Sequence, residues 1–279
     1  MNRKAEGSRR RRDPGDLMIP ILIIAGSDTS GGAGIQADVR TVAALGGHAF
    51  TVVTALTAQN STRITAIHEI PSPFIREQVA AVVEDAVPRA VKIGMLYSAE
   101  AVREVADLLR QYRFDRVVLD PVFRASTGRR LLAAEAVFVL KEELLPLVTV
   151  VTPNLAEAAL LSGMAVEGAA DMKRAAAAIH GAGPHVVVTG GHLKEDCVDL
   201  LYDGAAYYRF SGPRIETRHT HGTGCVFSTA LAVFLGRGKD LPEAVRSAHE
   251  AARRAIAGGY ACGAGAGPVD PGRGMDRDA

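Results

Sequence analysis

The sequence IPILIIAGSDTSGGAGIQADVRTV, residues 19–42, combines an apolar run, a glycine-rich loop and an amphipathic segment. Residues 19–25 are continuously apolar, as expected of a strand that is buried on both faces. Four glycines lie within residues 26–34, and apolar side chains then recur at helical spacing over residues 35–42. The pattern predicts a strand, a loop and a helix, and the loop backbone can lie close to a ligand because glycine has no Cβ.

Two general nucleotide-binding motifs fit this loop poorly. A P-loop needs Lys after the second glycine of G-x-x-x-x-G, but Gly26 and Gly31 are followed by Gly32. Residues 32–37 fit a relaxed dinucleotide fingerprint, yet they do not follow the strand directly. Residues 52–59, where the acidic residue that binds ribose is expected, carry no charge. The loop is therefore assigned to neither motif.

Short β-branched runs alternate with helical patterns along the rest of the chain. This alternation predicts an α/β fold with a parallel sheet that is covered by helices on both faces. Near the C-terminal end, Asp203-Gly204 separates residues 198–202 from residues 205–210 and predicts a late β-hairpin. The other predicted strands are residues 48–54, 90–93, 116–120, 148–152 and 185–189.

Composition excludes several classes of function. The chain has 279 residues, 48% of them hydrophobic, which suits one large α/β domain. A net charge of only +1 argues against nucleic acid as a partner, and no apolar run approaches the roughly 20 residues of a membrane span. The cysteines, Cys197, Cys225 and Cys262, are odd in number and lack C-x-x-C spacing. We therefore expect a reducing, cytoplasmic location and no membrane partner.

The two ends differ from the middle of the chain. Residues 1–18 carry a net charge of +3, and we predict a disordered basic tail. Their arginines and the following apolar run resemble a secretory signal, but cleavage after Ala25 would separate the first strand from the loop that it positions. Residues 263–279 are glycine-rich and are predicted to form a flexible tail. The expected domain therefore spans residues 19–262.

A second glycine-rich segment, His221-Gly222-Thr223-Gly224-Cys225, lies where a polar loop enters an apolar helix. The first-turn N–H groups of a helix have no intrahelical partner and bind anions, including a phosphoryl group in transfer. In that field the pKa of Cys225 is expected to be lowered, so that the thiolate can accept a proton. The alternative is a glycine-capped turn followed by a small buried cysteine.

Seven ordered blocks carry a family resemblance across most of residues 19–262. The chain resembles the hydroxymethylpyrimidine/phosphomethylpyrimidine kinases of thiamine biosynthesis, which are ribokinase-like. Three features depart from that pattern: Phe123 stands where Met is usual, Thr189 where Lys is frequent, and the arginine-rich tail is extra. The blocks are AGSD with SGGAGIQAD (25–38), TALTAQN (54–60), KIGML (92–96), LDPV (119–122), TPNL with EA (152–158), GGHL (190–193) and THGTGC (220–225).

The resemblance implies a ribokinase-like three-layer αβα sandwich that uses ATP and Mg²⁺ and forms a homodimer. ATP would phosphorylate 4-amino-5-hydroxymethyl-2-methylpyrimidine and then the resulting monophosphate. A pyridoxal-type vitamin kinase on the same fold is the alternative enzyme. A non-catalytic nucleotide-binding module and a thiol hydrolase with His221 or His192 as the base of Cys225 are alternatives of other classes.

Residue roles follow from the resemblance together with side-chain chemistry. The carboxamide of Gln59 offers a donor and an acceptor to an aminopyrimidine edge, and it could equally cap a strand end. Asn154 and Glu157 share one helical face and suit either water-mediated Mg²⁺ binding or helix capping. His219 and His221 lack a third ligand for a transition metal. The expected sites are catalytic Cys225, Gly222, Thr223 and Gly224; substrate-binding Gly26, Ala33, Asp38, Gln59, Gly94, Met95 and Val122; ATP-binding Asn154, Thr189, Gly191, His192 and Thr223; and metal-binding Asn154, Glu157 and Asp120.

Overall fold

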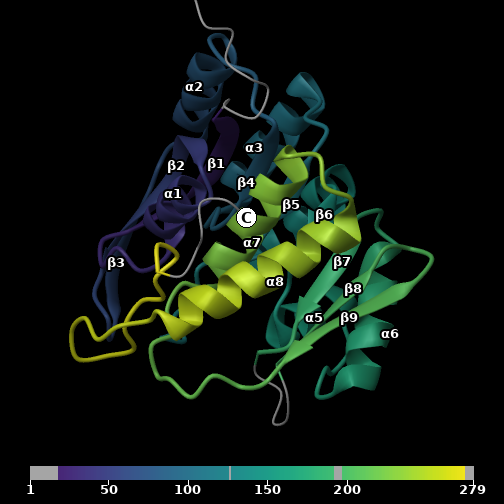
Figure 1. Ribbon diagram of the computed structural model, residues 1–279. Coiled ribbons are helices and arrows are strands. Elements are labelled where there is room, and N and C mark those ends of the chain that lie inside the picture. Colours follow the sequence, from purple (N-terminus) through teal and green to yellow (C-terminus); the bar gives the residue numbers. More distant parts are fainter. Residues whose placement is uncertain (1–17, 126, 192–196, 274–279) are drawn as a thin grey trace, which may run out of the picture.

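The computed structural model describes residues 18–125, 127–191 and 197–273, which contain one nine-stranded sheet (Figure 1). Its strand order is β3-β2-β1-β4-β5-β6-β7-β8-β9. The pairs from β2 through β7 are parallel, whereas β3, β8 and β9 each pair antiparallel with the preceding strand in the chain. The strands are β1 Ile19–Asp28, β2 Gly47–Gln59, β3 Ile64–Glu69, β4 Ala90–Ile93, β5 Val117–Leu119, β6 Val150–Val151, β7 His185–Thr189, β8 Cys197–Tyr202 and β9 Tyr207–Gly212.

Helices cover both faces of the sheet, so the predicted three-layer αβα sandwich with a late hairpin is confirmed. Alternate residues of β1 enter two separate cores, Ile21 and Ile23 on one face and Leu22 and Ile24 on the other. Helices α1 Gly34–Ala44, α7 Thr223–Gly236 and α8 Leu241–Ala257 pack on the first face. The second face carries α2 Ser72–Val83, α3 Ala99–Tyr112, α4 Ala134–Val139, α5 Leu155–Ser162 and α6 Ala169–His180, with the short turns η2 Leu140–Leu144 and η3 Leu145–Leu147.

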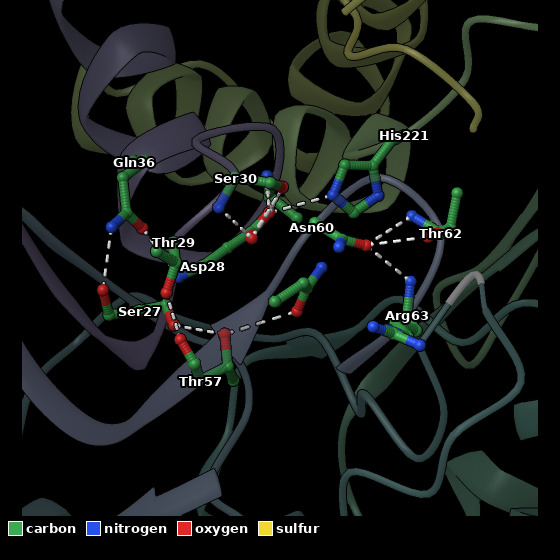
Figure 2. Close-up of polar contacts among 12 residues, drawn as sticks. Ser27, Asp28, Thr29, Ser30, Gln36, Thr57, Asn60, Thr62, Arg63 and His221 are labelled. Carbon is green, nitrogen blue, oxygen red and sulfur yellow. Dashed lines mark hydrogen bonds and ion pairs between the residues drawn. The ribbon is translucent and has the colours of Figure 1, made fainter. Parts of the chain in front are cut away.

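The edge strand β3 was not predicted. It pairs antiparallel with the end of β2, which runs five residues beyond the predicted strand and ends at Gln59. The connecting turn is built by Asn60, whose Oδ1 accepts hydrogen bonds from Thr62 N–H at 3.0 Å and Arg63 N–H at 3.0 Å (Figure 2). A side chain that closes its own turn replaces the glycine signal of a hairpin, which explains why the sequence pattern missed it.

The C-terminal segment differs from the flexible tail that we expected. Val269 is buried against Val226 of α7 and Ala255 of α8. Residues 267–269 also exchange backbone hydrogen bonds with His221, and Gly265 N–H donates to Ser61 Oγ at 3.0 Å. Residues 263–273 therefore pack on the domain, because the buried side chains of Pro268, Val269 and Pro271 and these backbone bonds hold a segment that is glycine-rich in sequence. Residues 1–17 and 274–279 lie outside the described residues.

Candidate functional site

The candidate site lies where the carboxyl ends of the parallel strands meet the N-termini of α1, α5 and α7. In a parallel α/β sheet this edge binds ligands. We call residues 28–34, between β1 and α1, the glycine-rich loop. We call residues 221–225, which lead into α7, the anion loop. Both loops and the segments after β5, β6 and β7 lie at this edge.

The carboxylate of Asp28 organises the glycine-rich loop. It accepts hydrogen bonds from Ser30 N–H at 2.8 Å, Ser30 Oγ at 2.7 Å and Ala33 N–H at 2.8 Å (Figure 2). His221 Nε2 of the anion loop approaches the same carboxylate at 2.9 Å. Burial raises the pKa of Asp28, but the hydrogen bonds from His221 and Ser30 outweigh it and lower the pKa to about 2. Asp28 is therefore ionised and holds both loops; sequence reasoning did not single it out.

The N-terminus of α7 is open to a ligand. Its N-cap residue, Gly222, has φ +88° and makes no side-chain capping hydrogen bond within the described part of the chain. A Cβ on Gly222 would overlap the carbonyl oxygen of Gly32, so the position requires glycine for both conformation and space. Thr223 N–H donates to Thr220 O at 3.3 Å. The N–H groups of Gly224 and Cys225 lie in the first turn, where no intrahelical partner exists.

The thiol of Cys225 does not have the lowered pKa that the sequence suggested. Burial raises its pKa to about 12, and the carboxylates of Asp38 and Asp120 contribute in the same direction. Lys92 and the N–H group of Gly34 oppose this shift. The earlier expectation is wrong for the ligand-free protein because desolvation of the thiolate outweighs the helix dipole. Cys225 is a neutral thiol in this state.

Asp38 lies in the core beneath the site rather than on its wall. Its carboxylate accepts hydrogen bonds from Lys92 Nζ at 2.9 and 2.8 Å and from Thr229 Oγ1 of α7 at 2.7 Å. Lys92 and Asp38 are both fully buried. Burial lowers the pKa of Lys92, but the neighbouring charges of Asp38, Cys225 and Asp120 raise it above its ordinary value. Asp38 is fully buried in the ligand-free protein, where the pair ties α1 to β4 and α7; a substrate contact of Asp38 stays a prediction.

Sequence reasoning placed Lys92 in a candidate segment but gave it no role. The available signal was a lysine inside the apolar run of β4, AVKI, where a charged side chain requires a buried partner. Without the fold, that partner could not be identified, because Lys92 and Asp38 are 54 positions apart in the chain.

Asn154 and Glu157 form a capping box at the start of α5. Asn154 Oδ1 accepts from Glu157 N–H at 3.0 Å, and Glu157 Oε2 accepts from Asn154 N–H at 2.9 Å. The capping alternative is thus confirmed. Burial, with the carboxylate of Asp120 as the next cause, raises the pKa of Glu157 to about 8. Two buried carboxylates that disfavour each other's ionisation fit a place for a cation.

The donor set fits Mg²⁺ better than a transition metal. Within residues 18–125, 127–191 and 197–273, no group of three or more His, Cys, Asp or Glu side chains is arranged to hold a metal ion. Mg²⁺ retains several waters and needs only one or two carboxylates beside phosphate oxygens. Asp120, at the end of β5, also accepts a hydrogen bond from Ser228 Oγ of α7 at 3.1 Å, which places it between α7 and the α5 side.

Most of the expected substrate residues lie together around the ends of β1, β2 and β4 and the segment after β5. Met95 and Val122 belong to one small apolar cluster with Ile64, and Ile64 pairs in register with Gln59 at the end of β2. A Cβ on Gly26 would lie 2.8 Å from Met95 Sδ, so the backbone of β1 lies directly against this side chain. The buried backbone of Gly94 lies next to Met95. The structure therefore brings Gly26, Gly94, Met95, Val122 and Gln59 into one neighbourhood, and Ala33 is the N-cap residue of α1.

The expected ATP residues are only partly described. Thr189 N–H donates to Pro153 O at 2.9 Å, and Thr189 forms a bridge with Asn154, so these two residues are adjacent. Gly191 is exposed, and His192 lies outside the described residues. Sequence reasoning missed a buried pair behind this segment: Asp199 Oδ2 lies 2.7 Å from His249 Nδ1, and Asp199 Oδ1 accepts from Gly190 N–H at 3.1 Å.

No helix in the described part of the chain is long and apolar enough to cross a membrane. This agrees with the absence of a long apolar run in the sequence.

Comparisons with known proteins agree on a kinase. The family model for phosphomethylpyrimidine kinase matches residues 28–270. A hydroxymethylpyrimidine/phosphomethylpyrimidine kinase of Streptomyces coelicolor is 47% identical over 253 residues, which cover 90% of this chain and 94% of the relative. The ADP complex of Bacillus subtilis pyridoxal kinase superposes with a TM-score of 0.86 at 37% identity, covering 92% of this chain and 98% of that one. A phosphomethylpyrimidine kinase of Clostridium difficile gives a TM-score of 0.77 at 38% identity, covering 85% and 99%.

Proposed function

Because the chain belongs to the phosphomethylpyrimidine kinase family, we propose that it transfers the γ-phosphoryl group of ATP to 4-amino-5-hydroxymethyl-2-methylpyrimidine and then to the monophosphate. The observation that carries the proposal is the open N-terminus of α7, with Cys225 beside Gly34 of the glycine-rich loop. This places an anion-binding backbone and a candidate base at one point. Residues 263–273 belong to the kinase domain in this proposal.

The pyrimidine would lie between the glycine-rich loop and the apolar cluster of Met95 and Val122. The Cβ positions of Gly26 and Gly94 face Met95 and Lys92, so Gly26, Ala33 and Gly94 would contact the flat ring through their backbone atoms. Gln59, at the end of β2, would bind the amine and the ring nitrogen. The hydroxymethyl oxygen would then face Cys225. In the transfer, this oxygen loses its proton to the sulfur of Cys225 and forms a bond to phosphorus, while the bond from phosphorus to the ADP oxygen breaks.

Cys225 can accept the proton only as a thiolate. Its pKa of about 12 in the ligand-free protein means that deprotonation requires positive charge near the thiol when the substrates bind. Lys92 is already placed to favour the thiolate, since its charge lowers the pKa of Cys225. The N–H groups of Gly224 and Cys225 would stabilise the phosphoryl oxygens, because a helix N-terminus carries partial positive charge.

Asn154, Glu157 and Asp120 would hold Mg²⁺ together with waters, and Thr189, Gly191 and His192 would lie along the phosphates. Bound Mg²⁺ supplies charge neutralisation of the phosphate oxygens. The raised pKa of Glu157 supports this assignment, because a cation would relieve the repulsion between the two buried carboxylates. Thr189 cannot contribute the charge of the lysine that the family resemblance led us to expect there.

Pyridoxal is the second candidate substrate. The supporting observation is that pyridoxal kinases of Bacillus subtilis and Staphylococcus aureus superpose with TM-scores of 0.86 and 0.84, whereas the phosphomethylpyrimidine kinase of Clostridium difficile gives 0.77. The sequence relatives favour the pyrimidine. A homodimer and a cytoplasmic location stay predictions.

A side-by-side assay tests the proposal. The purified protein is incubated with ATP, MgCl₂ and either the hydroxymethylpyrimidine or pyridoxal. The products are separated by anion-exchange chromatography and identified by mass spectrometry. We expect mono- and diphosphate of the pyrimidine and a lower kcat/KM for pyridoxal. Preference for pyridoxal would establish the second candidate instead. No ATP consumption with either compound would contradict the kinase proposal.

A further inference from the structure

The glycine-rich loop and the anion loop are far apart in the sequence, but their backbones are in direct contact in the structure. The Cα of Gly222 lies against the carbonyl oxygen of Gly32, where a Cβ could not fit. A Cβ on Gly32 would in turn overlap the ring of His221, and the backbone N–H of Gly34 lies close enough to the thiol of Cys225 to lower its pKa. Contacts this close mean that a displacement of one loop must move the other or separate the two.

One polar pair joins the loops across this contact. Asp28 Oδ2 and His221 Nε2 are 2.9 Å apart, and their side chains are 5% and 11% exposed (Figure 2). Asp28 is held on its own side by Ser30 and Ala33, so it moves with the glycine-rich loop. The water-excluded setting strengthens the hydrogen bond relative to one on the surface.

His221 is fixed from the opposite side by the C-terminal segment. Its N–H donates to Gly267 O at 3.2 Å, and Val269 N–H donates to its carbonyl oxygen at 3.1 Å. The residue that follows is Gly222, the N-cap of α7, so the backbone of His221 leads directly into the anion loop. His221 is thus held by the buried C-terminal segment through its backbone and by the glycine-rich loop through its ring.

We propose that Asp28 and His221 are a positioning pair that holds the substrate-side loop in register with the anion loop. The inference rests on the proposed function, since phosphoryl transfer is the reaction that needs this register. The glycine-rich loop would place the substrate and the N–H groups of α7 would receive the phosphoryl group. Transfer requires these two to stay within a few tenths of an ångström of their productive geometry. In this proposal both side chains act through the loops and not by contact with the reacting atoms.

The pairing also bears on the hydrolase alternative. A base for Cys225 would need a ring nitrogen of His221 directed at the thiol, whereas Nε2 is directed at Asp28. The geometry therefore assigns this nitrogen to positioning.

The main test compares His221→Leu, which removes the hydrogen bond, with His221→Gln, whose amide nitrogen can reach the place of Nε2. For His221→Leu we expect kcat to fall by about 10- to 100-fold, while the Kd values of nucleotide and pyrimidine, measured by calorimetry, change less than about threefold. His221→Gln should recover at least about tenfold of the lost kcat, since it restores a donor to Asp28. His48→Leu is the control, because His48 is exposed at the start of β2, at the opposite end of the parallel strands from both loops, and it should keep wild-type kcat.

Two results would overturn the proposal: a folded His221→Leu protein with kcat within about twofold of wild type, or equal losses in the Leu and Gln variants. If His221→Leu does not fold, the cycle of Asp28→Asn, His221→Asn and the double variant decides, because the shorter Asn side chain does not reach the place of Nε2. A pair that acts as a unit predicts that the double variant loses no more kcat than the worse single variant; additive losses contradict it.

A readout without catalysis separates this inference from the proposed function. Cys225 contacts Gly34, so loosening the loops should raise its alkylation rate by iodoacetamide at least about fivefold in His221→Leu, while the exposed Cys262 serves as an internal reference. Peptide mass spectrometry follows each cysteine. If wild type phosphorylates nothing but this change is seen, the kinase proposal fails and the pairing stands. An unchanged Cys225 rate contradicts the pairing whatever the activity.

Discussion

Two helix N-termini at the same edge of the sheet are capped differently. Helix α5 is closed by its own side chains, through the capping box of Asn154 and Glu157. Helix α7 has Gly222 as its N-cap residue and no side-chain cap among the described residues. The capping box satisfies the N–H groups of Asn154 and Glu157 and leaves a buried carboxylate with a raised pKa, which suits a cation. An open terminus keeps its donors, which suits an anion. A kinase that binds ATP with Mg²⁺ needs one of each.

Cys225→Ala should give the largest effect, because it removes the candidate base from the open terminus. We expect kcat to fall by about 100-fold or more, as for the loss of a general base, with nucleotide Kd unchanged. Steady-state kinetics and calorimetry measure the two quantities. Wild-type kcat in a folded Cys225→Ala protein would show that α7 acts through its backbone alone.

Glu157→Gln tests the closed terminus. The folded pKa of this acid is raised to about 8, so its ionised form costs stability as the pH rises from the unfolded value of 4.5 through 8. Gln keeps an acceptor for Asn154 N–H and removes the charge. At pH 7.5 in EDTA we expect the free energy of unfolding to rise by on the order of 1 kcal/mol, while the Mg²⁺-dependent kcat falls by about tenfold or more.

Asn154→Ala is the matched control at the same helix. It removes the cap and should lower stability by about 1 kcal/mol. If Glu157→Gln also destabilises the metal-free protein and leaves the Mg²⁺ dependence intact, α5 is capped for stability alone.

The pH dependence of stability tests the pairing of the Asp28 carboxylate with His221, the residue before the N-cap of α7. Its folded pKa of about 2 lies below the ordinary 3.8, so the ionised group stabilises the fold above about pH 4, and this contribution is lost as the pH falls from about 4 to 2. The shift corresponds to about 2 kcal/mol. Urea unfolding between pH 5 and 3 should show a steeper loss of stability in wild type than in Asp28→Asn. Parallel curves would mean that His221 and Ser30 do not stabilise the carboxylate.

Thr189→Lys should have the smallest effect, and it adds beside Asn154 the cation that the family resemblance led us to expect there. Because the added charge would lie near phosphate groups, we expect KM for the pyrimidine monophosphate to fall by about three- to tenfold and KM for the alcohol to change less. Product analysis with each substrate measures this. Equal changes in both KM values would place residue 189 away from the substrate's phosphate.

The sequence was sufficient wherever a feature depends on neighbouring residues. The strand, loop and helix of residues 19–42, the glycines at the start of the helix after His221 and the shared face of Asn154 and Glu157 all follow from local spacing and backbone sterics. The late hairpin followed from Asp203-Gly204 for the same reason. The alternation of strand-like runs with helical patterns also predicted a parallel sheet covered by helices on both faces, because a strand buried on both faces requires helices on each side.

Only the tertiary structure decided the electrostatics of the site. The pKa of Cys225 depends on burial and on Lys92, Asp38 and Asp120, which come from other elements. The partner of Asp28 in the anion loop and the partner of Asp38 on α7 are 193 and 191 positions away in the chain. The C-terminal segment is glycine-rich in sequence, and Val269 makes it part of the core. Desolvation and charge pairing act through space, so no local pattern can contain them until the fold has brought the groups together.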